Sequence, residues 1–308
     1  MKISRREMLK VGAGTGAAVL LGDLTAFAQS PAQLTRAVPS TGEAIPAVGL
    51  GGAGTFSRRA SDAERLKMKE VLRLFREMGG TVFDTAPTYG LSESVAGALA
   101  QELGIENDLF FATKISTGRG RASGVRQQDA SMRLWGRDMI DLNQVHNLRG
   151  VEEHLPTIRQ AKEEERTRYL GVTISRLRQF ADMEQVMRTE PLDFIQINYS
   201  LGERQAAERI LPLAQDRGFG VVINEPYNRG GLFRTVRARA LPEWAPELDC
   251  ESWGQFFLKY ILSHPAVTVV IPGTGDPGHL VDNMGAGVGR LPDEPTRKRM
   301  EEFFDGLG

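Results

Sequence analysis

Short apolar runs alternate with amphipathic segments along the chain after residue 28. Each run is short enough for one strand, and the segments between have the apolar spacing of helices. The runs predict eight strands, at residues 47–50, 81–85, 109–114, 139–146, 169–173, 194–198, 220–224 and 267–271. Strands that alternate with helices form parallel sheets, and eight such units close into a barrel. The pattern therefore predicts an α/β fold of the (β/α)8 TIM barrel type.

The intervening segments predict helices and one long loop. Ser61 and Glu64 form a capping box that begins a helix, and Gly79 ends it near residue 78. Further helices are expected at 92–102, 126–135, 151–165, 177–187, 204–217, 251–264 and 293–304, the last outside the barrel. Residues 226–245 are rich in Arg, Gly and Pro, which predicts a long loop after the seventh strand. In barrels, loops of this kind lie on the face that carries the chemistry.

Residues Gly49 to Gly54 match the G-x-G-x-x-G pattern of dinucleotide-binding Rossmann folds. In that fold the glycines themselves begin a helix. Here residues 55–59 have the composition of a loop, and the next helix begins only at Ser61. The pattern is therefore weak evidence for a Rossmann fold, and the barrel remains the preferred prediction.

Composition narrows the classes of function. The 308 residues are 41% hydrophobic and 25% charged, as in an ordinary soluble enzyme. A formal net charge of -1 gives no reason to expect nucleic acid as a partner. Cys250 is the single cysteine, which excludes an internal disulfide and a cysteine-based metal site. With four histidines, a multi-histidine metal site is also not expected.

The first 28 residues predict a targeting segment. Arg5 and Arg6 precede an apolar, Gly/Ala-rich stretch, and the small-x-small sequence that ends at Ala28 suits cleavage there. The alternative is an amphipathic first helix, which the glycines at 12, 14 and 16 would weaken. The segment resembles a twin-arginine (Tat) signal peptide. That resemblance implies export by the Tat translocation machinery, as a folded protein, to the periplasm. Residues 29–308 would remain as one barrel domain without stable membrane insertion.

Polar side chains that end predicted strands are the candidates for chemistry in a barrel. Asp84, Lys114 and His146 each close an apolar run, and Tyr89 follows Asp84 closely. Alone, each has a plain alternative: a turn cap, an exposed lysine, a core histidine and an aromatic at the rim. Because the strand ends of a barrel meet on one face, the four residues are better treated as one set.

Each member of this set supplies what another lacks. A phenol has a pKa near 10, and a neighbouring ammonium lowers it. Moving the pKa of Tyr89 by about three units towards neutrality needs about 4 kcal/mol, which a partly buried Lys114 can supply. Asp84 would keep that lysine charged, and a neutral His146 would orient a carbonyl oxygen. The set predicts catalytic residues that polarise a carbonyl group and protonate its oxygen.

At these residues the sequence resembles the aldo-keto reductase family. The segment 82–93, with Asp84 and Tyr89, is similar to the second-strand motif of that family. The Ala-Thr-Lys at 112–114 and the Val-His at 145–146 match its lysine and histidine positions in order. Similarity continues through 195–200, 271–274 and 282–283, and covers nearly all of the chain after residue 40. The resemblance implies a barrel that binds NADPH or NADH in an extended form across its mouth.

By the same resemblance, positions for cofactor binding are assigned one by one. Gly54 and Thr55 would lie near the nicotinamide ribose, and Thr173 and Gln196 would bind the carboxamide. Asn224 stands where relatives commonly stack an aromatic side chain on the nicotinamide. The remaining positions would surround the pyrophosphate and the adenosine end: Pro226, Tyr227, Thr274, His279, Asp282 and Asn283.

Several of these positions depart from the family pattern. Ile174 replaces an asparagine at the carboxamide, and Asn224 cannot stack as an aromatic ring does. Gly273 and His279 stand where basic residues often hold the 2′-phosphate of NADPH. A partly titrated imidazole holds phosphate less firmly than a guanidinium. The sequence therefore leaves the choice between NADPH and NADH open.

Three functions follow from these observations. The first is reduction of a small aldehyde or ketone by hydride from NAD(P)H, with Tyr89 as general acid. The second is a cofactor-holding binding or sensor module with little turnover, which the altered Ile174 and Asn224 and the expected export favour. The third is a barrel lyase or isomerase that forms a Schiff base on Lys114. The sequence leaves the substrate and the oligomeric state open.

Overall fold

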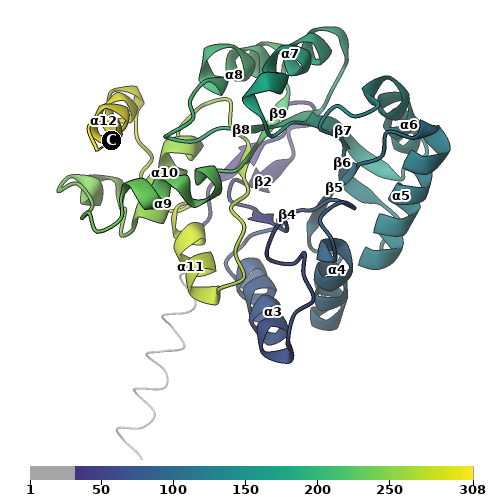
Figure 1. Ribbon diagram of the computed structural model, residues 1–308, viewed down its shortest axis with the longest axis horizontal. Coiled ribbons are helices and arrows are strands. Elements are labelled where there is room, and N and C mark those ends of the chain that lie inside the picture. Colours follow the sequence, from purple (N-terminus) through teal and green to yellow (C-terminus); the bar gives the residue numbers. More distant parts are fainter. Residues whose placement is uncertain (1–31, 308) are drawn as a thin grey trace, which may run out of the picture. The chain divides into compact units, whose positions relative to one another are not determined.

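The computed structural model describes residues 32–307 and contains a closed barrel of parallel strands (Figure 1). The sheet has eight strands in sequential order from β3 to β10, and a parallel bridge between Val48 and Val270 closes it. The strands are β3 (Leu50–Gly51), β4 (Val82–Asp84), β5 (Phe110–Ile115), β6 (Ile140–His146), β7 (Thr167–Thr173), β8 (Phe194–Asn198), β9 (Gly220–Asn224) and β10 (Val269–Val270). The predicted (β/α)8 barrel is confirmed. The predicted signal peptide at 1–28 lies outside the described residues.

Helices surround the strands, as Figure 1 shows. They are α3 (Asp62–Glu77), α4 (Ser92–Leu103), α5 (Gly120–Trp135), α6 (Val151–Glu163), α7 (Phe180–Thr189), α8 (Ala206–Arg217), α10 (Trp253–Leu262), α11 (Pro277–Gly285) and α12 (Glu294–Asp305). The predicted capping box is present: Ser61 accepts a hydrogen bond from the backbone N–H of Glu64, whose side chain accepts one from the backbone N–H of Ser61. From Gln33 onward, the described residues form one compact unit.

The glycines of the G-x-G-x-x-G pattern allow strands to approach closely. A Cβ atom at Gly49 would lie 2.8 Å from the carbonyl oxygen of Val82, and one at Gly51 would lie 2.9 Å from that of Ile271. Real Cβ atoms do not come so near to backbone oxygens. These positions therefore need glycine for barrel closure, and no helix begins at them.

A short hairpin covers the amino-terminal end of the barrel, and the sequence pattern did not predict it. Strand β1 (Thr35–Ala37) pairs antiparallel with β2 (Ala44–Pro46). Val38 and Ile45 are buried against side chains from seven barrel strands and the segment after β10, including Phe110 and Phe194. Thr41 binds the hydroxyl of Tyr169 at 2.8 Å. The hairpin therefore closes the barrel interior at the end opposite the strand tips.

The segment at 226–245 corrects the prediction of one long loop. It contains a 3-10 turn η3 (Asn228–Gly230), a short helix α9 (Gly231–Thr235) and the start of a second 3-10 turn, η4 (Ala245–Leu248). Leu232 is buried in the core, so the segment packs against the barrel instead of extending into solvent. The helix α11 was also not predicted, and α5 begins at residue 120 where the pattern predicted 126.

Two features are absent from the part of the chain that the structure describes. Within 32–307, no helix has both the length and the apolar character needed to cross a membrane. The same residues contain no group of three or more His, Cys, Asp or Glu side chains placed to hold a metal ion.

Candidate active site

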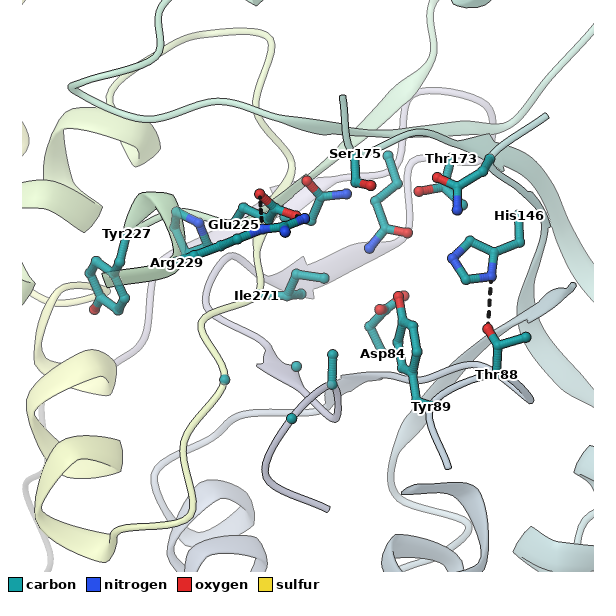
Figure 2. Close-up of a pocket in the computed structure, with 18 of the residues that line it drawn as sticks. Asp84, Thr88, Tyr89, His146, Thr173, Ser175, Glu225, Tyr227, Arg229 and Ile271 are labelled. Atoms are coloured by element: carbon teal, nitrogen blue, oxygen red, sulfur yellow. Dashed lines mark hydrogen bonds and ion pairs between the residues drawn. The ribbon is translucent and has the colours of Figure 1, made fainter. Parts of the chain in front are cut away.

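A cavity of about 770 Å³ opens at the carboxyl ends of the barrel strands (Figure 2). Its volume lies within the usual range for small-molecule sites. The wall brings together side chains from β4, β6, β7, β8 and β9 and from the loops that follow them. Nine of the predicted site residues line it: Gly54, Asp84, Tyr89, His146, Thr173, Gln196, Asn224, Pro226 and Tyr227.

Lys114 and Asp84 form a buried ion pair beneath this cavity. The Lys114 ammonium donates hydrogen bonds to both carboxylate oxygens of Asp84, each at 2.8 Å, and to the carbonyl oxygen of Thr85 at 2.7 Å. The two side chains are 1% and 4% exposed. Burial acts to lower the pKa of Lys114, but the Asp84 carboxylate, together with Tyr89 and Glu93, acts in the opposite direction, and the pKa is raised overall. The lysine is therefore charged, as the sequence predicts.

The phenol of Tyr89 lies beside both Lys114 and His146. The Lys114 nitrogen is 5.2 Å from the centroid of the tyrosine ring. The rings of Tyr89 and His146 meet edge to face, with centroids 5.6 Å apart. Burial raises the pKa of Tyr89 above 10, although the Lys114 ammonium acts to lower it. The expected net lowering of this pKa is therefore wrong, because burial outweighs the ammonium, and the phenol holds its proton.

His146 is neutral and has a defined orientation. Burial, with the charges of Lys114 and Arg149, lowers the pKa of His146 to about 3. Its Nδ1 lies 2.7 Å from the hydroxyl of Ser116 and 3.2 Å from that of Thr88. Thr88 also donates a hydrogen bond to Ser116 at 3.4 Å. If Ser116 donates in turn to Nδ1, the ring proton lies on Nε2, so we infer that Nε2 is a hydrogen-bond donor.

Sequence reasoning missed the two hydroxyls that hold His146. Ser116 directly follows β5, which ends at Ile115, and Thr88 immediately precedes Tyr89. The one sequence feature that could have identified them as site residues is their position shortly after the ends of predicted strands. A serine or threonine in a loop is too common to be selected without the fold.

Two amide side chains, Gln196 on β8 and Asn224 on β9, also line the cavity. Asn224 donates a hydrogen bond from Nδ2 to the carbonyl oxygen of Ile174 at 2.9 Å. The oxygens Oδ1 of Asn224 and Oε1 of Gln196 are buried and have no hydrogen-bond partner. Buried polar atoms are normally paired, so unpaired amides in a cavity wall indicate a ligand that completes them. A ligand carboxamide fits, because it both donates and accepts hydrogen bonds.

Five predicted cofactor residues lie outside the wall of this cavity. Asp282 accepts hydrogen bonds from Ser252 and Gln255, and Asn283 accepts one from the hydroxyl of Tyr227 at 2.5 Å. The other residues of this group are Thr55, Thr274 and His279. The cavity thus brings together the predicted catalytic residues and most of the predicted nicotinamide residues, whereas Thr55 and the residues predicted for the adenosine end do not line it.

The wall also contains charged side chains that were not predicted as site residues. Glu225 and Arg229 line the cavity beside Pro226 and are joined by an ion pair. Arg229 falls in the segment at 226–245, where the composition had predicted only a loop, and Glu225 directly precedes that segment.

The chain is similar to known proteins along most of its length. Residues 47–301 match the model of the Aldo/keto reductase family. The aldo-keto reductase str7 of Strobilurus tenacellus is 28% identical over 294 residues, which cover 82% of this chain and 86% of that protein. L-galactose dehydrogenase of Arabidopsis thaliana is 27% identical over 288 residues, with coverage of 82% and 87%. A crystal structure of an aldo/keto reductase from Klebsiella pneumoniae in complex with NADP and acetate has a TM-score of 0.71 at 23% identity, with coverage of 85% and 93%, and is similar in fold.

Proposed function

The chain belongs to the aldo/keto reductase family of oxidoreductases, and we propose that it reduces an aldehyde or ketone to an alcohol with NADPH or NADH, with Tyr89 as general acid. The observation that supports this most is the contact of Tyr89 with both Lys114 and His146 at the cavity. Two uncharged donors, the phenol and the imidazole N–H, are then available to one carbonyl oxygen. A charged, buried ammonium lies next to the phenol.

In this proposal each residue has a separate role. His146 donates a hydrogen bond to the substrate oxygen and fixes its position. Tyr89 transfers its proton to that oxygen as negative charge develops there. Lys114 stabilises the resulting phenolate by its charge, and Asp84 keeps Lys114 protonated. The raised pKa of Tyr89 suits this role, because the acid must be protonated before the reaction begins.

The cofactor, when bound, supplies the hydride that the carbonyl carbon receives. The unpaired amides of Gln196 and Asn224 fit its carboxamide, and Thr173 lies in the same wall. Gly54, Pro226 and Tyr227 also line the cavity and are proposed to hold the rest of the dinucleotide. Thr55 is proposed to lie near the nicotinamide ribose, and Thr274, His279, Asp282 and Asn283 are proposed for the adenosine end. The NADP in the Klebsiella pneumoniae structure supports this class of cofactor.

A Schiff base on Lys114 is a poorer match to the site. That reaction needs an uncharged amine with a free lone pair. The Lys114 ammonium is held by Asp84 and the Thr85 carbonyl, and its pKa is raised.

The direct test measures multiple turnovers. Oxidation of NADPH and of NADH is followed by the absorbance of the reduced nicotinamide, with a panel of aldehydes, ketones and sugars. Wild type should turn over repeatedly with at least one carbonyl, and Tyr89→Phe should not. Dinucleotide binding without turnover on any carbonyl would instead support the binding or sensor module.

We also propose that residues 1–28 are a Tat-type leader and that 29–308 is the mature, periplasmic protein. The paired Arg5 and Arg6 ahead of an apolar stretch support this. Mass spectrometry of the protein from the periplasmic fraction should show a chain that begins at Gln29. The double variant Arg5→Lys/Arg6→Lys should remain uncleaved in the cytoplasm, and unchanged export of this variant would contradict the proposal.

A further inference from the structure

The cavity wall contains an ion pair, between Glu225 and Arg229, that has no role in the proposed function. Glu225 and Arg229 both line the cavity, in the loop that follows β9. Arg229 donates hydrogen bonds from Nε and Nη2 to the two oxygens of the Glu225 carboxylate, at 3.0 and 2.5 Å. Figure 2 shows the Arg229 side chain extending to Glu225 across the part of the cavity between Tyr227 and Ser175.

Arg229 is also the one lysine or arginine among the described residues that line this cavity. The other titratable side chains of the wall add little positive charge. Asp84 is paired with Lys114, and the low pKa of His146 keeps its imidazole neutral. A dinucleotide carries a negatively charged diphosphate, so Arg229 is the cation in this wall to which it can bind.

The pair is held by an unusual backbone conformation. Glu225, Asn228 and Arg229 have φ values of 48°, 47° and 51°, although none of them is glycine. This left-handed conformation costs about 1 to 2 kcal/mol for each such residue. The backbone N–H of Asn228 donates to the carbonyl oxygen of Glu225 at 2.8 Å, which closes the turn. The strained turn directs the carboxylate onto the guanidinium. Strain that persists in a cavity wall is a reason to look for a function.

We propose that Glu225 is an internal competitor for the phosphate site on Arg229. A carboxylate and a phosphate both bind the planar edge of a guanidinium through two parallel hydrogen bonds, so one replaces the other. Binding of the cofactor diphosphate then requires Arg229 to leave Glu225. The pair lowers the affinity for dinucleotides and makes Glu225 an affinity-determining residue of the site. This inference rests on the proposed function for the identity of the ligand, and on the geometry alone for the competition.

The test is a double-mutant cycle of Glu225→Gln and Arg229→Ala, measured by isothermal titration calorimetry at one fixed, low salt concentration. The probes are NADPH and inorganic pyrophosphate. Glu225→Gln should tighten NADPH binding by about fivefold, the upper range for a solvent-accessible ion pair. Arg229→Ala should weaken it by about threefold in wild type, but by about tenfold in the Glu225→Gln background. Arg229 thus contributes more when the carboxylate does not occupy it.

The sign of this coupling decides the inference. If Arg229→Ala costs as much or more in wild type as in the Glu225→Gln background, Arg229 holds both anions at once or neither, and competition is overturned. Glu77→Gln serves as the matched control, since Glu77 pairs with Arg73 at the same i,i+4 spacing on α3. It should leave both affinities unchanged.

The pyrophosphate arm separates this inference from the proposed function. If wild type binds neither NADPH nor NADH, the proposed cofactor is wrong. The same cycle with pyrophosphate still reports whether Glu225 and an anion compete for Arg229.

Discussion

Two sets of polar groups in the cavity wall differ in whether they already have hydrogen-bond partners: the set around Tyr89 and the set with Gln196, Asn224 and Arg229, which we call the two halves of the cavity. Around Tyr89, the charged and ring groups already have protein partners: Lys114 binds Asp84, and His146 binds Ser116. Around Gln196 and Asn224, two buried amide oxygens have no partner. The one guanidinium of the wall, on Arg229, is held by a carboxylate of its own loop.

This difference separates the tasks of the two halves. Groups that act in a reaction are most effective when they are held in place before the ligand arrives. Groups that bind a ligand either leave a protein hydrogen-bond partner for the ligand or gain the ligand as their first partner. The half with Tyr89 is thus preorganised, and the half with Asn224 and Arg229 is completed by the ligand.

The largest effect is expected from Tyr89→Phe. Loss of the phenolic proton should lower kcat by about 10³-fold, within the usual range for a general acid. Dissociation constants for NADPH should not change, because the ring remains and the other half of the cavity is untouched. Steady-state kinetics and calorimetry check the two statements separately. A variant that loses cofactor affinity together with turnover would show that the two halves are not separate.

Lys114→Met tests how much the buried Lys114–Asp84 pair of the preorganised half contributes to the stability of the fold. It leaves the Asp84 carboxylate buried without its partner, which should cost about 3 to 5 kcal/mol in the free energy of unfolding. Urea denaturation monitored by tryptophan fluorescence measures this. The control is the double variant Asp84→Asn/Lys114→Met, which should recover part of the loss since no buried charge remains. If the single variant is as stable as wild type, the pair is not buried in solution.

Gln196→Leu tests the half that the ligand completes. The variant keeps the volume of the side chain but removes its amide. The dissociation constant for NADPH should rise about fivefold to tenfold, the effect of one lost hydrogen bond. ADP-ribose, which has no nicotinamide, is the matched control ligand and should bind as it does to wild type. An equal loss for both ligands would place Gln196 away from the carboxamide.

The smallest effect concerns pH. The pKa of His146 is lowered to about 3, so acidification through the usual histidine range near pH 6.5 does not charge the ring. The pKa of Tyr89 is raised above 10, so the phenol keeps its proton on the alkaline side. Between about pH 5 and pH 9, kcat/KM for carbonyl reduction should therefore be nearly flat. A break near pH 6.5 that disappears in His146→Gln would refute the neutral imidazole.

The barrel could be predicted from sequence because its strands are locally encoded. Residues 194–198 and 220–224, for example, are apolar runs bounded by polar segments, and both strands have those bounds. Asp84 and His146 were found for the same reason, since each ends such a run. The carboxyl ends of parallel strands lie on one face of a barrel. Residues at the ends of predicted strands could therefore be expected to lie close together in space.

Other features depend on tertiary contacts that no local pattern carries. The strands β1 and β2 have three residues each, too short for a periodic signal. The pKa of Tyr89 was expected to fall because of a neighbour in the motif, yet burial by the whole cavity raises it. The turn at Glu225 to Arg229 has left-handed residues that are not glycine, so composition gave no sign of it.

The hairpin of β1 and β2 has a consequence for the order of assembly. It leaves the ribosome before every strand that it covers, yet Val38 and Ile45 pack against side chains as far along the chain as Ile271. Contacts over such separations form late, because most of the chain must be ordered first. The earliest described segment to be synthesised is therefore among the last to dock, and the barrel stays open at its base until nearly the whole protein has been made.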